Sequence, residues 1–222
     1  MGAALTLSGC GGGATGTTGD VPTTAPLTFS TTTTTPTSTL ATPTSRPYIG
    51  PNGFPVETGP FLAASTTTRL GAIVDGIQCE PIAQLAYATY SHLQVYVDGR
   101  SRALPGGIGL VDQDVAATPH GLYYGTHTCM YWLHTRASDG LIEAESPVPR
   151  IFTLGNLFAI WHQPLSTTRV AGARGKVTAT VNGRRWRRNP AAIPLTQHAA
   201  IQLAVGRPVP RPQPVDWIGT NF

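Results

Sequence analysis

Charged residues are scarce in this chain, and long apolar segments are absent. Only 12% of the 222 residues are Asp, Glu, Lys or Arg. No apolar run approaches the roughly 18 residues that a transmembrane helix needs. The sequence also has no Gly-x-Ser-x-Gly motif and no glycine-rich phosphate loop, which removes the usual signatures of α/β-hydrolases and nucleotide-binding proteins. We therefore expect a binding or scaffolding role in preference to catalysis.

Closely spaced metal-binding motifs are missing too. The six histidines include no His-x-His or His-x₃-His pair, so their spacing does not predict a metal. Two of them, His92 and His134, begin or lie within predicted strands near Glu143 and Glu145. These four residues are a candidate metal or polar site, with partly exposed structural histidines as the alternative.

The N-terminus contains a short motif around its first cysteine. Residues 7–10 read Leu-Ser-Gly-Cys, which resembles the lipobox of bacterial lipoproteins. The resemblance implies lipidation of Cys10, and attachment to the outer face of the cytoplasmic membrane or to the outer membrane. Residues 1–10 have no Lys or Arg and few apolar residues, so we expect a truncated signal whose start lies upstream. The alternative is a cysteine without a targeting role.

Three cysteines leave one over in an exported protein. Lipidation of Cys10 accounts for the odd one and leaves Cys79 and Cys129 free to pair. An oxidising compartment favours this disulfide, and two separate buried thiols are the alternative. Zinc ligation by the pair is less favoured, because the close Cys-x₂₋₄-Cys spacing is absent.

Composition divides the chain into a tether and a domain. Residues 11–46 are almost entirely Gly, Thr, Ser, Ala and Pro, too few of them large and apolar to offset the entropy of ordering. We expect this segment to be a disordered tether. Residues 47–222 have the composition of one folded domain.

The domain contains a repeated hairpin signal. Residues 95–110 and 178–195 both read Val, Asp or Asn, Gly, Arg, and then Pro, Ile and Leu at similar intervals. Asp98-Gly99 and Asn182-Gly183 suit tight hairpin turns, and apolar residues alternate before each turn. A further strand is expected at 200–205. The sequence predicts a mainly β fold, an antiparallel sheet or sandwich with an internally repeated hairpin, although chance convergence of hairpin sequences is an alternative to duplication.

A third hairpin and one helix lie between the repeats. With Asp139-Gly140 as a two-residue turn, Arg136 lies opposite Glu143 and His134 opposite Glu145. The following segment, 152–164, predicts an amphipathic helix, because it has apolar residues at i, i+3, i+4 and i+7. Thr153 is its expected N-cap, and Pro164 is expected to stop it.

Basic residues gather toward the C-terminus. Residues 1–145 hold ten acidic residues and five arginines, a balance of −5, whereas 146–222 hold ten Lys or Arg and one Asp, a balance of +9. The densest group is Arg184, Arg185, Trp186, Arg187 and Arg188. We expect it to contact anionic envelope polymers, lipid headgroups or another envelope protein, with a solvated hairpin arm as the alternative. Nucleic acid is the least favoured partner, because no nucleic-acid-binding motif accompanies the group.

Three stretches together resemble an uncharacterised domain of secreted bacterial and archaeal proteins. They are SHLQVYVDGRSRALPGGIG at 91–109, CMYWLHTRASDGLIEAESP at 129–147 and FTLGNLFAIW at 152–161. That domain reads Cys-x-Tyr-x-Leu-His-Thr-His-Asp, then Gly-x-Ile-His-x-Glu-Ser-Pro, then Thr-Leu-Gly-x-Phe-Phe-x-x-Trp. Its extra histidines imply a transition metal such as copper or iron.

This chain departs from that pattern at the histidines. His134 matches, but Arg136 and Glu143 stand where histidines are expected, as do Ala88 and Tyr90 further upstream. The first hypothesis is therefore a non-enzymatic, membrane-anchored binding or scaffolding lipoprotein without a cofactor. The alternatives are a metal-binding or redox accessory domain with an altered histidine site, and an enzyme of unknown class.

Overall fold

The described part of the chain is mainly β-structure. The computed structural model describes residues 48–220 and 222, with Gly13 and Gly16. The predicted lipidation site Cys10 and nearly all of the predicted tether lie outside these residues. The strands are β1 Cys79–Glu80, β2 Tyr87–Val97, β3 Arg100–Arg102, β4 Leu110–Thr118, β5 Gly121–Tyr131, β6 Leu133–His134, β7 Leu141–Ser146, β8 Phe152–Thr153, β9 Arg169–Val170, β10 Ala173–Arg174, β11 Val177–Val181, β12 Arg184–Trp186, β13 Pro194–Leu195 and β14 Ala199–Val205. One α-helix, α1 (Leu154–Ile160), and two 3₁₀ turns, Ser65–Thr67 and Pro190–Ala192, complete the set.

A seven-stranded sheet forms the centre of the fold, in the order β12-β11-β14-β2-β7-β6, with β3 also paired to β2. The two repeated hairpins are β2–β3 and β11–β12. All four turn residues have positive φ: Asp98, Gly99, Asn182 and Gly183. This is the type I′ geometry whose twist suits adjacent antiparallel strands. Both predicted turns are therefore confirmed.

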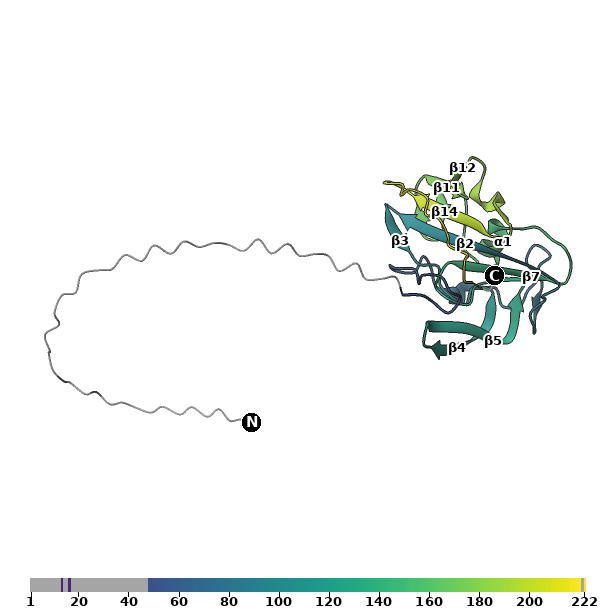
Figure 1. Ribbon diagram of the computed structural model, residues 1–222, viewed down its shortest axis with the longest axis horizontal. Helices are drawn as coiled ribbons and strands as arrows, with labels where there is room; N and C mark the ends of the chain where they lie inside the picture. Colours follow the sequence, from purple (N-terminus) through teal and green to yellow (C-terminus); the bar gives the residue numbers. More distant parts are fainter. Residues whose placement is uncertain (1–12, 14–15, 17–47, 221) are drawn as a thin grey trace, which may run out of the picture. The chain divides into compact units, whose positions relative to one another are not determined.

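β14 lies between the two hairpins (Figure 1). It pairs antiparallel with β11 and parallel with β2, with Ile201 beside Leu93 and Leu203 beside Val95. These four side chains are fully or almost fully buried, so their alternation places one face of the sheet on the core. The predicted mainly β fold with one short helix is confirmed, and the β14–β2 pair makes the otherwise antiparallel main sheet a mixed one.

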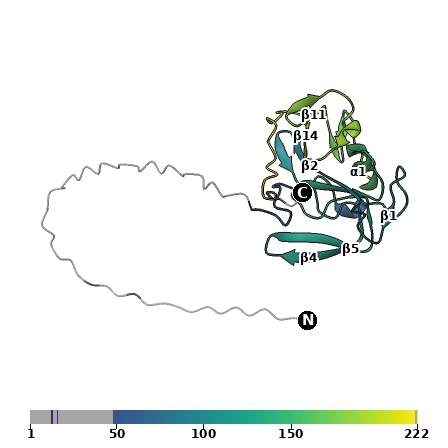
Figure 2. The ribbon, with the colours of Figure 1, turned by 45° about the vertical axis from the view of Figure 1, so that its right-hand side comes forward.

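A second, three-stranded sheet has the order β1-β5-β4. The long β4–β5 hairpin extends away from β11, β14 and β2 in both ribbon views (Figures 1 and 2). Cys79 on β1 and Cys129 on β5 form the predicted disulfide, with a Cα–Cα distance of 5.4 Å, inside the usual range of about 4.4–6.8 Å. The bond ties the short segment β1 to the base of the hairpin.

Helix α1 covers part of the core. Its Thr153 cap accepts a hydrogen bond from the backbone of Asn156, whose side chain in turn accepts from the backbone of Thr153, the reciprocal capping box. The predicted apolar stripe is buried: Leu154, Leu157, Phe158 and Trp161. The helix ends at Ile160, earlier than predicted, because His162 takes a left-handed conformation before Pro164 is reached. No helix among residues 48–220 has the length and apolarity to cross a bilayer.

We expect Thr153→Ala to lower the free energy of unfolding by about 1 kcal/mol, because it leaves a helix N–H without its side-chain acceptor. Chemical denaturation followed by circular dichroism measures this change. Thr66→Ala is the matched control, since Thr66 is exposed and no hydrogen bond of its side chain is found among the described residues. An equal loss in the two variants would contradict the capping role.

Candidate functional site

The predicted third hairpin is present, but its strands pair in a register that differs from the predicted one by two residues. His134 on β6 lies opposite Glu143 on β7, where the two-residue turn had placed Glu145. The chain leaves the ladder after His134 because Thr135 bonds to another segment: its N–H donates to Ile108 O at 3.0 Å, and its hydroxyl donates to Pro105 O at 2.8 Å. Residues 135–140 therefore form a longer loop. A shift of two preserves the face on which each side chain lies.

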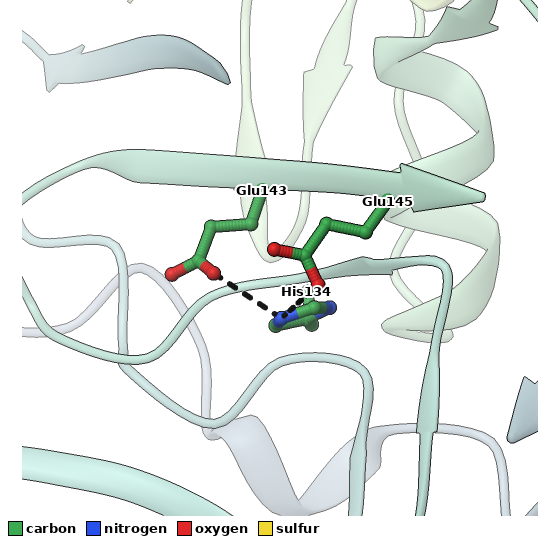
Figure 3. Close-up of side chains that lie close together, drawn as sticks. All are labelled: His134, Glu143 and Glu145. Carbon is green, nitrogen blue, oxygen red and sulfur yellow. Dashed lines mark ion pairs between the residues drawn. The ribbon is translucent and has the colours of Figure 1, made fainter. Parts of the chain in front are cut away.

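His134, Glu143 and Glu145 consequently meet in one buried cluster, which we call the His–Glu–Glu cluster. The two glutamates project from the same side of β7 toward the imidazole of His134 (Figure 3). His134 Nε2 lies 3.4 Å from Glu143 Oε2 and 4.0 Å from Glu145 Oε2. All three side chains are buried, that of His134 completely.

The orientation of the imidazole is fixed by the backbone. His134 Nδ1 lies 2.9 Å from Tyr131 O, and since a carbonyl only accepts, Nδ1 carries the proton and donates. Nε2 is left facing the glutamates. Backbone carbonyls commonly orient metal-binding histidines in this way, exposing the other ring nitrogen to the ion.

Three buried atoms of the cluster have no hydrogen-bond partner among the described residues: His134 Nε2, Glu143 Oε1 and Glu145 Oε2. Arg136 supplies one positive charge, since its Nε lies 3.3 Å from Glu143 Oε2. It contacts only one of the two carboxylates. A buried polar atom without a partner lowers the stability of the folded protein. The cluster also has two carboxylates and a single arginine beside them, so it offers the ligand atoms and the negative charge that a cation site needs.

The two glutamates ionise differently. Burial, together with the nearby Glu143, raises the pKa of Glu145 above its usual value, and His134 and Arg136 offset this only partly. Burial acts on Glu143 too, but His134 and Arg136 outweigh it and hold the pKa of Glu143 below its usual value. Glu143 is therefore the anchored carboxylate, and Glu145 is the one held by fewer contacts.

The positions where the resemblance predicts histidines surround this cluster. On β2, Tyr90 pairs with Glu143 and Ala88 pairs with Glu145, so both lie on the cluster's side of the sheet. Arg136 contacts Glu143 directly. The four positions hold an aromatic ring, a methyl group, a guanidinium group and the carboxylate of Glu143, so His134 is the single imidazole among these residues of the cluster.

His92 does not join the cluster, contrary to prediction. It lies on the same face of the sheet, but its Nε2 donates to Asp139 O at 2.7 Å, and its ring packs 5.4 Å from that of Phe54. Burial lowers its pKa to about 4. His92 is thus a neutral residue of the neighbouring core, held there by the same 135–140 loop that altered the register.

That neighbouring region contains two acids that the sequence did not reveal, the buried Asp139 and the half-buried Glu57. Asn52 donates to Asp139 Oδ1 at 3.3 Å, and Glu57 accepts from the backbone of Leu104 at 2.5 Å. Burial raises the pKa of Glu57 to about 8 and that of Asp139 to about 6. These residues come from segments far apart in the chain, so no local pattern indicated them.

The predicted basic group lies elsewhere, on the edge strand β12 and the residues that follow it. Arg184 and Arg185 are exposed and Trp186 is half-buried. Within residues 48–220, no carboxylate oxygen lies within the 4.0 Å ion-pair distance of these arginines, nor of Arg187 or Arg188.

Comparison with known proteins gives no family for this chain. No family model matches it, and searches of the curated proteins and of the solved structures found no match. The function must therefore be inferred from the geometry of the sites themselves.

Proposed function

We propose that this chain is a non-enzymatic binding module of the cell envelope, and that its His–Glu–Glu cluster holds one divalent transition metal ion. The observation that carries this proposal is the meeting of three buried side chains that each offer a ligand atom, His134 Nε2 and one carboxylate oxygen from each of Glu143 and Glu145. These atoms all lie within 4.8 Å of one another. An ion bonded at about 2.0–2.2 Å would draw them together by a modest movement.

The ligand set favours an ion of intermediate hardness. One imidazole with two carboxylates suits Zn²⁺, Fe²⁺ or Mn²⁺ better than Cu⁺, which prefers sulfur. The one thioether nearby, Met130 Sδ, already accepts from Arg136 at 3.4 Å. We therefore favour a divalent ion such as zinc, iron or manganese over monovalent copper.

The surroundings support a structural ion. Residues 82–84 and Trp132 lie over the His134–Glu145 side of the cluster, where no space remains for a water molecule. Catalytic metal sites keep an open position for water or substrate, and none is found on this side of the cluster. The ion would join β6 to β7, which supports a binding module over an enzyme.

Placement in the envelope rests on the lipobox-like sequence ending at Cys10 and is supported by the disulfide. Disulfides persist in exported proteins and are rare in the reducing cytosol. We propose that lipidated Cys10 attaches the domain to the membrane through the 11–46 segment.

We expect the wild-type protein, refolded with equimolar Zn²⁺ or Mn²⁺ and dialysed, to retain about one ion per chain by elemental analysis. Free metal should also raise the melting temperature, because at one hundred times the Kd it adds about 2.7 kcal/mol to the free energy of unfolding. Glu145→Gln should abolish both effects. Glu145 is chosen because Glu143 also pairs with Arg136, so that replacing Glu143 would disturb the fold directly.

The matched control is Asp114→Asn. It removes a carboxylate 3.9 Å from His127, a pair that lies exposed on the β4–β5 hairpin, and it should leave metal retention unchanged. Failure of the wild-type protein to retain any of the tested ions would contradict the proposal. The positive charge of the cluster would then be a proton shared between His134 and the two glutamates. Equal retention in Glu145→Gln and wild type would contradict the assigned site.

A further inference from the structure

Two hollows adjoin the β11–β12 hairpin, at the end where β12 stops and β11 begins. The first has a volume of about 450 Å³ and includes Arg187 and Arg188; the second, of about 460 Å³, includes Arg207. Lys176 and Arg185 line both. The hollows therefore meet at these two side chains.

The hollows lie on opposite faces of the sheet edge. Ala179 and Trp186 form a cross-strand pair, so they share one face, and both line the first hollow. Arg185 pairs with Thr180, which places it on the other face with Thr178 of the second hollow. A chain-like ligand could pass over the edge from one hollow to the other at Arg185.

Five cations line these hollows, and we call them the basic edge: Lys176, Arg185, Arg187, Arg188 and Arg207. All five are exposed, and no acidic residue lines either hollow. None of them is in an ion pair with a carboxylate in the part of the chain that the structure describes. Clustered charge of one sign attracts an anionic ligand.

The composition of the basic edge differs from the group predicted by sequence. Arg184 lines neither hollow, because it pairs with Val181 at the turn end of the hairpin, away from the end where the hollows lie. Lys176 and Arg207 replace it, brought in from the start of β11 and from the segment after β14.

We infer that the basic edge binds a linear phosphate polymer, with successive phosphates in the two hollows and over Lys176 and Arg185 between them. Four of the five cations are arginines, whose guanidinium groups form paired hydrogen bonds with phosphate oxygens. A flat bilayer could not contact both faces of a sheet edge at once. The shape therefore favours a chain over a lipid surface.

Single-stranded nucleic acid is a weaker fit, because its binding sites combine positive charge with aromatic rings on which bases stack. Trp186 is the one aromatic residue lining the hollows, and the guanidinium of Arg188 lies over its ring at 5.3 Å. That ring face is already occupied, so a polymer without bases matches the surface better.

The test compares two triple variants of equal charge in the full chain. The first replaces three members of the basic edge with glutamine: Arg185, Arg187 and Arg207. The control replaces three exposed arginines that line neither hollow: Arg100, Arg174 and Arg184. Binding of short linear polyphosphate is measured by calorimetry at low salt, with single-stranded DNA and vesicles of phosphatidylglycerol and phosphatidylcholine as competing probes.

We expect wild type to bind polyphosphate more tightly than either other probe. The first variant should lose at least about tenfold in affinity and the control less than about threefold, since only the first removes local contacts in addition to net charge. Equal losses in the two variants would overturn the inference, because net charge would then explain binding. Tighter binding to vesicles or to DNA would also overturn it, in favour of a lipid surface or a nucleic acid.

Discussion

Replacing Cys79 and Cys129 together with serine is expected to lower the free energy of unfolding by about 4 kcal/mol. The disulfide closes a loop of 50 residues in sequence, and in the chain-entropy model a loop of that size contributes roughly this amount by restricting the unfolded chain. A further loss is expected locally. Besides this bond, β1 is held by a two-residue ladder to β5, so its segment should open more readily in the variant.

Chemical denaturation of the wild type, with and without reductant, measures the same quantity without a mutation. The two comparisons should agree. Cys10→Ser is the control and should leave stability unchanged, because Cys10 takes no part in this bond. A double variant as stable as the wild type would show that the disulfide does not restrict the unfolded chain as the model requires.

Glu57→Gln is expected to stabilise the protein increasingly as the pH rises. Burial raises the pKa of Glu57 from 4.5 to about 8, so between these values the folded state holds a proton that the unfolded state has released. The stability of the wild type then falls with pH across this window. Glutamine stays neutral and can still accept the hydrogen bond from Leu104, so it avoids this loss.

The gain of the variant over the wild type should grow by roughly 3 kcal/mol between pH 5 and pH 8, allowing for the partial exposure of Glu57. Taking this difference at each pH removes contributions that both proteins share. One of these has the opposite sign: the pKa of His92 is lowered to about 4, so His92 makes stability rise with pH up to about 6.5. A gain that stays constant from pH 5 to pH 8 would show that Glu57 ionises freely in the folded state.

The elements that short sequence patterns predicted are those held by local contacts. Asp98-Gly99 and Asn182-Gly183 form turns because their own backbone preferences favour positive φ. Thr153 caps α1 through Asn156, three residues away. In each case the residues that specify the structure are neighbours in the chain. The local sequence pattern therefore predicts the turn or the cap without knowledge of the fold.

The errors arose where distant segments decide the outcome. The two-residue turn at Asp139-Gly140 was locally reasonable, but Thr135 bonds to Ile108 and Asp139 bonds to Asn52, and these contacts lengthen the loop. The predicted grouping of side chains was unaffected by this error, because a register shift of two residues leaves each side chain on the same face of the sheet. His134, Glu143 and Glu145 were therefore grouped correctly with the wrong partners opposite one another.

The environments of Asp139 and the half-buried Glu57 could not be predicted from the sequence. Glu57 and Asp139 stand in the sequence like ordinary surface residues, and their raised pKa values come from burial created by segments that are remote in the chain. His92 is similar, since its orientation depends on the carbonyl of Asp139. Sequence patterns report the chemistry of a side chain but not how deeply the fold will bury it.

The place of β14 in the main sheet bears on how the protein is made. This strand, 199–205, joins β11 to β2, yet it leaves the ribosome, or any export channel that threads the chain from its N-terminus, after every other strand of the sheet. Until then β2 and β11 present unpaired edges, which are prone to non-native association. The sheet can therefore close only after β14 has been synthesised, and protection by a chaperone is valuable in the interval between β2 and β14.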